Sequence, residues 1–249
     1  MTSYQALAEI YDQLMDDVDR ESWCSYLVLL LRERGVNGGR ILDAACGTGE
    51  MTCRLLRAGY DVTGSDRSEE MLRIARERMR GSGKRCMLIR QDLTRIEMPG
   101  HVDAISCACD GVNYLTDDGS VRAFFSGAFK ALKDGGVLLF DISSASKLRA
   151  MDGQFYAEDR GQIAYIWNNR MEGDLLKMDI TFFTERDDGL YVRMDETHIQ
   201  RAHDEKKLCE MLEDEGFTDV CVYGFQTERA PEQADDRIQF AAVKKERRG

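Results

Sequence analysis

The feature that most constrains the fold is an alternation of short apolar strands with amphipathic helices, which continues to about residue 142. The expected strands are residues 40–46, 60–66, 86–90, 102–109 and 137–142. The expected helices are residues 4–15, 21–34, 50–58, 69–80 and 120–133. Strands and helices that alternate in this way predict a parallel sheet whose two faces are both covered by helices.

A different pattern interrupts the alternation between about residues 154 and 202. Three strand-like segments begin at Ile163, Leu175 and Leu190, and turn-forming residues at 172–174 and 187–189 separate them. We therefore expect an antiparallel β insert. After the insert, the expected elements are a helix over residues 204–215 and strands at 217–226 and 237–244.

The change of pattern divides the chain into three parts. These parts are N-terminal helices in residues 1–35, a core in residues 36–150 and 203–249, and the insert in residues 151–202. We expect the N-terminal helices to act as a lid over the site. We expect the insert to contact the substrate, to cap the site or to form a dimer surface.

The charge and hydropathy of the chain limit the partners that it can have. Lysine and arginine number 34 against 45 aspartates and glutamates, a formal net charge of −11, whereas binding to long nucleic acid needs clustered basic residues. No apolar run is long enough for a membrane helix, and the N-terminus lacks the basic-then-apolar layout of a signal peptide. We expect a cytoplasmic protein that acts on a small molecule rather than on nucleic acid or a membrane. Whether the chain forms a homodimer stays open.

The eight cysteines do not form a recognisable metal or disulfide pattern. No CxxC pair occurs, and most of the cysteines lie inside apolar runs. We therefore expect buried, reduced thiols and no metal site.

The segment from Ile41 to Glu50 carries the clearest functional signal. Gly47 and Gly49 follow a strand directly, so the backbone can approach a ligand and helix N–H groups can point at it. A dinucleotide fingerprint needs a third glycine where Thr52 stands, and a phosphate-binding loop needs a Gly-Lys-Ser/Thr sequence that is absent. Asp43 would repel a phosphate but tolerate a sulfonium cation. A cofactor without a pyrophosphate fits better.

Two further acids follow the next strands. Asp66 ends the second expected strand, where a carboxylate can accept hydrogen bonds from both ribose hydroxyls. Asp92 follows the third strand, where it can meet an adenine edge. For both residues a purely structural role in a turn or a cap stays open. For Asp43, holding the amides of the loop stays open beside direct contact with a ligand.

This ordered set of residues resembles the motifs of the class I S-adenosylmethionine-dependent methyltransferases. The match runs from the DAACGTG segment at residues 43–49 through Asp66 and residues 91–93 to the LKDGGVLLF segment at residues 132–140. The chain is most similar to small bacterial members with Tyr-Asp near the N-terminus and a β insert before the last helix. The matching pieces there are Tyr11-Asp12, residues 109–115 and residues 198–201.

The resemblance implies an α/β fold of the Rossmann-like, doubly wound kind. The implied fold has a mostly parallel seven-stranded sheet, helices on both faces and an inserted antiparallel β subdomain. It also implies S-adenosylmethionine as the cofactor and S-adenosylhomocysteine as the product. One departure from the family is Ala45, which stands where the wider family often has glycine.

The resemblance further implies a set of site residues. Gly49 would help to shape the loop around the methionine part of the cofactor. The implied cofactor-binding residues are Tyr11, Asp43, Ala45, Cys46, Gly47, Asp66, Arg67, Gln91, Asp92, Leu93 and Asp110. The candidate acceptor-binding residues are Tyr4, Asn113, Tyr114, Trp167, His198 and Arg201. A structural role stays open for each of them: helix packing for Tyr4, a loop cap for Asn113 and Tyr114, and packing within the insert for the other three. Asn113, Tyr114 and His198 are the catalytic candidates, and His198 has the chemistry of a general base.

The expected reaction is in-line transfer of a methyl group to an unidentified small molecule. Three alternatives stay open: methylation of RNA or protein, a cofactor-binding module without turnover, and a nicotinamide oxidoreductase. The Asn-Pro-Pro-Tyr type of motif found in many nucleic-acid amino methyltransferases is absent after the fourth strand, where residues 109–114 read CDGVNY. The missing glycine at Thr52 disfavours the oxidoreductase.

Overall fold

The structure is a computed structural model that describes Asp12 and residues 18–245. The helix expected over residues 4–15, with the site candidates Tyr4 and Tyr11, therefore lies outside the described residues except at Asp12. The central strands are β1 (Arg40–Ala44), β2 (Asp61–Asp66), β3 (Met87–Arg90), β4 (Val102–Cys107), β5 (Leu132–Ser143), β10 (Phe217–Gly224) and β11 (Arg237–Lys244). They form one sheet in the order β10-β11-β5-β4-β1-β2-β3. Only β11 runs in the direction opposite to the other six strands. The predicted mostly parallel seven-stranded sheet is therefore confirmed.

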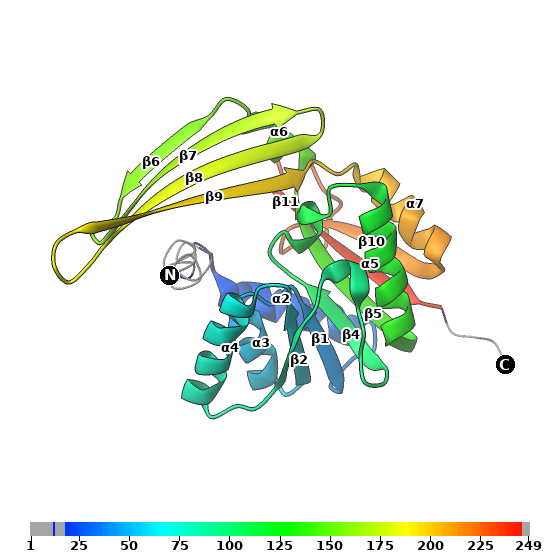
Figure 1. The fold of residues 1–249 in the computed structure, drawn as a ribbon. Helices are drawn as coiled ribbons and strands as arrows, with labels where there is room; N and C mark the ends of the chain where they lie inside the picture. The colour runs from blue at the N-terminus through cyan, green and yellow to red at the C-terminus, as the bar shows by residue number, and fades with distance from the viewer. Residues whose placement is uncertain (1–11, 13–17, 246–249) are drawn as a thin grey trace.

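Helices cover both faces of this sheet (Figure 1). The helices are α2 (Arg20–Glu33), α3 (Glu50–Arg57), α4 (Glu69–Ser82), α5 (Asp118–Ala131) and α7 (Glu205–Glu215). Leu27 of α2 and Leu55 of α3 belong to one buried cluster, with α4 beside α3, whereas Phe124 of α5 and Leu208 of α7 belong to another. Two apolar clusters on opposite faces are what a doubly wound sheet requires.

Local residues set the ends of the helices as the sequence predicts. The Ser68 hydroxyl accepts a hydrogen bond from the N–H of Met71 at the start of α4, and the Asp204 carboxylate caps α7 in the same way. Gly216 ends α7 with a φ of 108°, a left-handed conformation that favours glycine. These caps position the strand that follows each helix.

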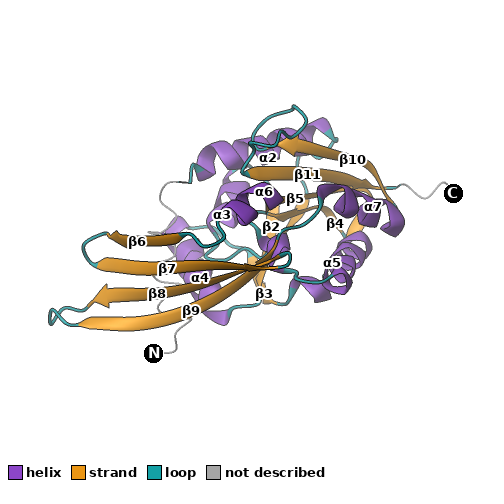
Figure 2. Ribbon diagram, turned by 90° about the horizontal axis from the view of Figure 1, so that it is seen from above, coloured by secondary structure: helices purple, strands orange, loops and turns teal. Residues whose placement is uncertain are grey.

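The insert forms a second, antiparallel sheet of four strands, also as predicted. Its strands are β6 (Phe155–Asp159), β7 (Ile163–Glu172), β8 (Leu175–Glu185) and β9 (Tyr191–Arg201), in that order. Figure 1 and Figure 2 show this sheet projecting from the core beyond the ends of β4 and β5. We call its core-facing side the inner face. The inner face carries Tyr165, Trp167, Ile180, Glu196 and His198.

Two elements are not predicted by the sequence. The short helix α6 (Ala145–Ala150) follows β5, and β6 forms the edge of the insert. All five residues of β6 are exposed, so the strand has no apolar alternation to mark it. The boundary between α5 and β5 also differs from the prediction, because Leu132 already pairs with Val102 before a register shift.

Two short 3-10 helices follow β3 and β4, η1 (Leu93–Arg95) and η2 (Gly111–Tyr114). All eight cysteines are free, but only Cys24, Cys53 and Cys107 are buried, so the expectation of buried thiols is wrong for the other five, which are partly exposed. Among the described residues, no helix has the length and apolar character that crossing a membrane requires. Within residues 18–245 and Asp12, no group of three or more His, Cys, Asp and Glu side chains is arranged to hold a metal ion.

Candidate functional site

The glycine loop, residues 45–49, connects β1 to α3 by a sharp turn. Ala45, Gly47 and Gly49 adopt φ values of 55°, 53° and 77°. Glycine takes such left-handed conformations freely, whereas an alanine there costs about 1–2 kcal/mol. The backbone geometry therefore explains why glycine is common at position 45 in the family that the sequence resembles. The loop leaves the first N–H groups of α3 unpaired by their own helix and available to a ligand.

Asp66, at the end of β2, holds this loop in place. Its Oδ2 accepts a hydrogen bond from the N–H of Gly47 at 2.9 Å, and its Oδ1 accepts one from the N–H of Ser68 at 2.8 Å. Burial raises the pKa of Asp66, and the two backbone hydrogen bonds oppose that rise. Each carboxylate oxygen has a further lone pair, so Asp66 can still accept a hydrogen bond from a ligand hydroxyl.

Asp43 is buried at the end of β1, where it is 1% exposed. Its Oδ2 accepts a hydrogen bond of 2.5 Å from the hydroxyl of Thr52. Burial raises the pKa of Asp43 to about 7. The residue that replaces the third glycine of a dinucleotide fingerprint is thus a fully buried threonine that serves this aspartate.

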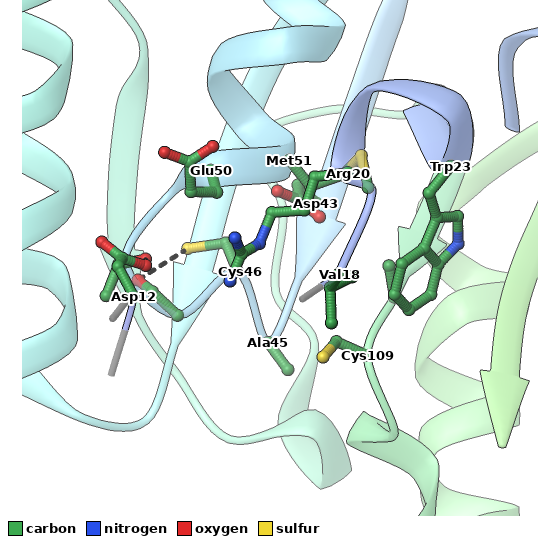
Figure 3. Close-up of a pocket in the computed structure, with 13 residues that line it drawn as sticks. Asp12, Val18, Arg20, Trp23, Asp43, Ala45, Cys46, Glu50, Met51 and Cys109 are labelled. Atoms are coloured by element: carbon green, nitrogen blue, oxygen red, sulfur yellow. Dashed lines mark hydrogen bonds between the residues drawn. The ribbon is translucent and has the colours of Figure 1, made fainter. Parts of the chain in front are cut away.

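A cavity of about 80 Å³, which we call the loop cavity, opens beside the glycine loop. Figure 3 shows Asp12 and Cys46 at the left and Trp23 of α2 at the right, with the side chains of Asp43 and Arg20 between them. The sequence predicts Trp23 as an inward residue of a helix but does not predict that α2 reaches the site. Only the packing of α2 beside β1 and α3 reveals that contact.

Asp12 connects the N-terminal region to the glycine loop. Its Oδ1 accepts a hydrogen bond of 2.8 Å from the hydroxyl of Thr48, and its Oδ2 pairs with Arg78 at 2.5 Å. Asp12 also lines the loop cavity. The Tyr-Asp pair of the sequence resemblance therefore has at least its aspartate at the site.

The three predicted adenine contacts lie together next to Asp66. The N–H of Gln91 donates to the carbonyl of Asp66 at 3.1 Å, and Nε2 of Gln91 is buried without a hydrogen-bond partner in the described part of the chain. Asp92 is exposed and caps η1 by accepting from the N–H of Thr94 at 2.9 Å. Arg67 is exposed, and Leu93 packs against the core at the end of β3.

A second cavity of about 270 Å³, which we call the sheet cavity, lies under the inner face of the insert. Its lining residues are Cys109, Asp110, Tyr114, Ser143, Lys147, Leu148, Met151, Tyr165, Trp167, Met178, Ile180, Phe182, His198 and Gln200. Cys109 also lines the loop cavity, so the two cavities meet at this residue. Tyr114, Trp167 and His198 are thus brought together as the sequence suggests. Lys147, Met178 and Gln200 are not predicted, although Met178 and Gln200 follow the same period of two as the predicted residues.

Tyr114 and His198 form a pair inside the sheet cavity. The Tyr114 hydroxyl lies 3.2 Å from Nδ1 of His198, and the two rings meet edge to face. Burial raises the pKa of Tyr114 to about 12. Burial lowers the pKa of His198, and the positive charge of Arg67 lowers it further. Both groups are therefore neutral near pH 7, as a proton acceptor and its hydrogen-bond partner should be.

Two of the predicted acceptor-binding residues do not line the sheet cavity. Asn113 is fully buried, and its Nδ2 donates to the carbonyls of Ser143 at 3.1 Å and Arg201 at 2.9 Å. Its Oδ1 accepts from the N–H of Ser143 at 2.9 Å. The Arg201 side chain turns to Asp118, at 2.8 Å. Asn113 therefore joins the end of β5 to the end of β9, and both residues position the insert rather than face a ligand.

Asp110, which is predicted to bind the cofactor, takes part in a buried network of ion pairs and hydrogen bonds. Arg237 of β11 pairs with Asp110 at 2.6 Å and also with Asp141 of β5. Asp141 accepts hydrogen bonds from the N–H groups of Cys109 at 2.8 Å and Asp110 at 3.2 Å. Burial raises the pKa of Asp141 to about 6, against the opposing charge of Arg237.

The network fixes the junction between the two cavities. Cys109 and Asp110 both have left-handed φ values, 68° and 63°, which are unfavourable for residues with a side chain. The hydrogen bonds to Asp141 hold these two residues in that conformation. Arg237 and Asp141 carry no local sequence signal, because their partners lie far away along the chain.

Comparison with known proteins finds relatives along almost the whole chain. Residues 41–136 match a family model described as a methyltransferase domain. A Bacillus subtilis (strain 168) protein provisionally named as a methyltransferase is 37% identical, with 97% of each chain covered. A crystal structure of an S-adenosylmethionine-dependent methyltransferase from Clostridium acetobutylicum ATCC 824 is 31% identical, with a TM-score of 0.89 and coverage of 97% of this chain and 99% of that chain. An S-adenosylmethionine-bound amino pentose methyltransferase from Micromonospora echinaspora shares the fold at 18% identity, with a TM-score of 0.77 and coverage of 94% and 96%.

Proposed function

This chain belongs to the class I S-adenosylmethionine-dependent methyltransferases, and we propose that it methylates a small molecule held in the sheet cavity. The observation that carries this proposal is the meeting of the two cavities at Cys109. The loop cavity adjoins the glycine loop that would hold the methionine part of the cofactor. The sheet cavity, at about 270 Å³, is just below the usual range of about 300–1,000 Å³ for small-molecule pockets.

The residues around the glycine loop suit S-adenosylmethionine. Asp66 would accept hydrogen bonds from the ribose hydroxyls, and the buried Nε2 of Gln91 would donate to the adenine. The side of Gly47 is open, because an added Cβ there would meet no atom within 4 Å. Arg67, Asp92 and Leu93 would flank the adenosine. The amino pentose methyltransferase that shares the fold has S-adenosylmethionine bound, which supports the same cofactor here.

When bound, S-adenosylmethionine supplies a methyl group on a sulfonium, which leaves as a neutral thioether. The protein then has mainly to hold the nucleophile of the acceptor about 3 Å from the methyl carbon and to exclude water. The inner face of the insert is suited to exclude water, because Trp167, Met178 and Phe182 line the sheet cavity. The insert is thus the proposed acceptor wall. The proposed lid residues Tyr4 and Tyr11 lie outside the described residues.

His198 is the proposed base for an acceptor that arrives protonated. If Nδ1–H of His198 donates to the oxygen of Tyr114, its Nε2 is free to accept a proton. The lowered pKa of His198 keeps the ring neutral at pH 7, so no prior deprotonation is needed. Tyr114 would fix the tautomer and the orientation of the ring.

Calorimetric titration of the purified protein with S-adenosylmethionine, S-adenosylhomocysteine and NAD tests the cofactor. We expect both adenosyl ligands to bind and NAD not to bind. Incubation with methyl-labelled cofactor and separate metabolite and RNA fractions then tests the acceptor. Label should enter a product from the metabolite fraction. Binding of NAD alone would overturn the cofactor proposal, and label found only in RNA would overturn the small-molecule proposal.

A further inference from the structure

We propose that the inner face of the insert binds a cationic group of the methyl acceptor, a protonated amine or a guanidinium, through the carboxylate of Glu196. This inference rests on the proposed function, because it takes the sheet cavity as the acceptor site. It adds a second recognition point to the one expected at the reacting atom. It also narrows the class of acceptor to small molecules that carry a positive charge.

Glu196 is a buried carboxyl group that the proposed mechanism does not use. It is 6% exposed, and its Oε1 is buried without a hydrogen-bond partner among the described residues. Burial raises the pKa of Glu196. A buried polar atom without a partner costs free energy and is uncommon in folded proteins. A ligand that supplies the missing partner would remove that cost.

Trp167, in the same row of paired residues on the inner face as Glu196, carries a second polar atom without a hydrogen-bond partner. Trp167 pairs with Ile180, and Ile180 pairs with Glu196, so their side chains lie side by side on the same face. Nε1 of Trp167 is likewise buried without a hydrogen-bond partner in the described structure. Trp167 and Ile180 both line the sheet cavity, and Glu196, which is not itself a lining residue, lies next to Ile180 on the neighbouring strand. From the spacing of strands, Trp167 and Glu196 lie about 10 Å apart, so a ligand across Ile180 can reach both.

The charges on the inner face favour a cation at Glu196. The other carboxylate on this face, Glu158, already accepts from the hydroxyl of Tyr165 at 2.6 Å and pairs with Arg160 at 2.9 Å. Oε1 of Glu196 has no such partner within the described residues. The rings of Tyr165 and Trp167 border the sheet cavity on the same inner face and also attract a cation. An anion at this position would be repelled.

The position of Glu196 relative to His198 sets the spacing of groups in the acceptor. The two residues are two positions apart on β9 and therefore lie on the same face, about 7 Å apart along the strand. His198 lies closer to Tyr114 and the junction at Cys109. The acceptor should thus carry its nucleophilic atom near His198 and its cationic group about 7 Å farther out, with an apolar body between them.

Three indoles that differ in the charge of the side chain at position 3 test this inference. Tryptamine is a cation, 3-ethylindole is neutral and indole-3-propionate is an anion. Each is titrated by calorimetry into the wild-type protein and the Glu196→Gln variant, with and without S-adenosylhomocysteine. We expect wild-type protein to bind tryptamine at least tenfold more tightly than 3-ethylindole and to bind the anion most weakly. In Glu196→Gln the preference for tryptamine should fall below threefold.

The matched control is Asp195→Asn, which removes one negative charge from the adjacent, outward-facing position of β9, where Asp195 pairs with Arg193. This control should keep the preference for tryptamine. A preference that survives in Glu196→Gln, that is lost equally in Asp195→Asn, or that favours the neutral or anionic probe would overturn the inference, as would failure of tryptamine to bind. Binding of S-adenosylhomocysteine is read in the same titrations, so failure of the cofactor proposal is distinguishable from failure at Glu196.

Discussion

The loop cavity and the sheet cavity meet at one residue, Cys109, yet they are built in opposite ways. The wall of the loop cavity that the glycine loop forms depends on backbone conformation within a short segment, in which Ala45, Gly47 and Gly49 all have positive φ. The sheet cavity depends on side chains from three separate stretches, residues 109–114, 143–151 and 165–200. A site made by the backbone tolerates little change in sequence. A site made by side chains on regular strands can be altered one residue at a time.

The largest expected effect concerns the junction that both cavities share. A substitution that disrupts this junction should affect both cavities and not one alone. Arg237→Met leaves Asp110 and Asp141 buried without their cation. We expect the free energy of unfolding, measured with urea, to fall by about 3–5 kcal/mol. Arg229→Met, which removes an exposed pair with Asp235, is the control and should have a much smaller effect. Equal losses in the two variants would mean that the network does not hold the junction.

The next effect belongs to the loop cavity and depends on pH. The pKa of Asp43 rises to about 7 on folding, so the folded protein holds this proton more tightly than the unfolded chain does. The stability contributed by this group is therefore full below about pH 4 and is lost as the pH rises toward 7. Asp43→Asn cannot titrate. Between pH 4.5 and 7.5 the free energy of unfolding of the wild type should fall by about 2–4 kcal/mol more than that of Asp43→Asn. Parallel curves for the two proteins would contradict this.

Asp66→Ala should weaken binding in the loop cavity and leave binding in the sheet cavity unchanged. Loss of the carboxylate removes the proposed ribose contact and frees the N–H of Gly47. We expect the affinity for S-adenosylhomocysteine to fall at least tenfold, about 1.5–3 kcal/mol, the range for hydrogen bonds to charged groups. Binding of tryptamine in the sheet cavity should not change. Asp61→Ala, at the exposed other end of β2, is the control, and a similar loss of affinity there would remove the special role of Asp66.

Arg67→Gln tests the electrostatic link between the cavities. Arg67 is a proposed cofactor-binding residue next to Asp66, yet its charge lowers the pKa of His198 in the sheet cavity. Without that charge, the pKa of His198 should move upward toward its ordinary value of 6.5. NMR titration can follow this directly, because the chain has only three histidines. The buried His203, whose pKa is about 4, is an internal reference that should not move.

The smallest effect returns to the backbone of the glycine loop. Ala45→Gly removes the strain of a left-handed alanine but adds entropy to the unfolded chain. These terms oppose each other, so we expect a net gain of only about 0.5 kcal/mol in the free energy of unfolding. Ala44→Gly, in the preceding strand, should instead destabilise the protein. If both variants lose stability to the same degree, left-handed strain at Ala45 does not matter.

The same contrast explains how much the sequence can predict. The alternation and the glycine loop are local, so the main sheet, the helix caps and the residues around Asp66 follow from short segments. Thr52 is recognisable as a missing glycine, but its hydrogen bond to Asp43 is not, because the sequence does not show which way a buried hydroxyl points. The edge strand β6 is missed because all of its residues are exposed.

The sheet cavity is harder to predict, since its geometry depends on contacts between distant segments. Asn113 stands at the end of a strand, where a ligand contact is reasonable, but its amide is occupied by the backbone of β5 and β9. Arg237 and Asp110 are 127 residues apart, so no local pattern joins them. Glu196 and Gln200 share the alternation that marks His198, but only the pairing of β9 with β8 shows that all three face inward.

The period of two in β7, β8 and β9 limits how an enzyme of this kind can acquire a new acceptor in evolution. A substitution at Met178, Ile180 or Phe182 changes the wall of the sheet cavity and leaves the solvent-facing neighbours untouched. Deletion of a single residue within β8 would instead turn every later side chain to the opposite face. Changes in length are tolerated best at the hairpin loops, which contain Gly161, Gly173 and Gly189. With the sheet cavity as the proposed acceptor site, acceptor preference would therefore diverge by point substitution while the lengths of the strands stay constant.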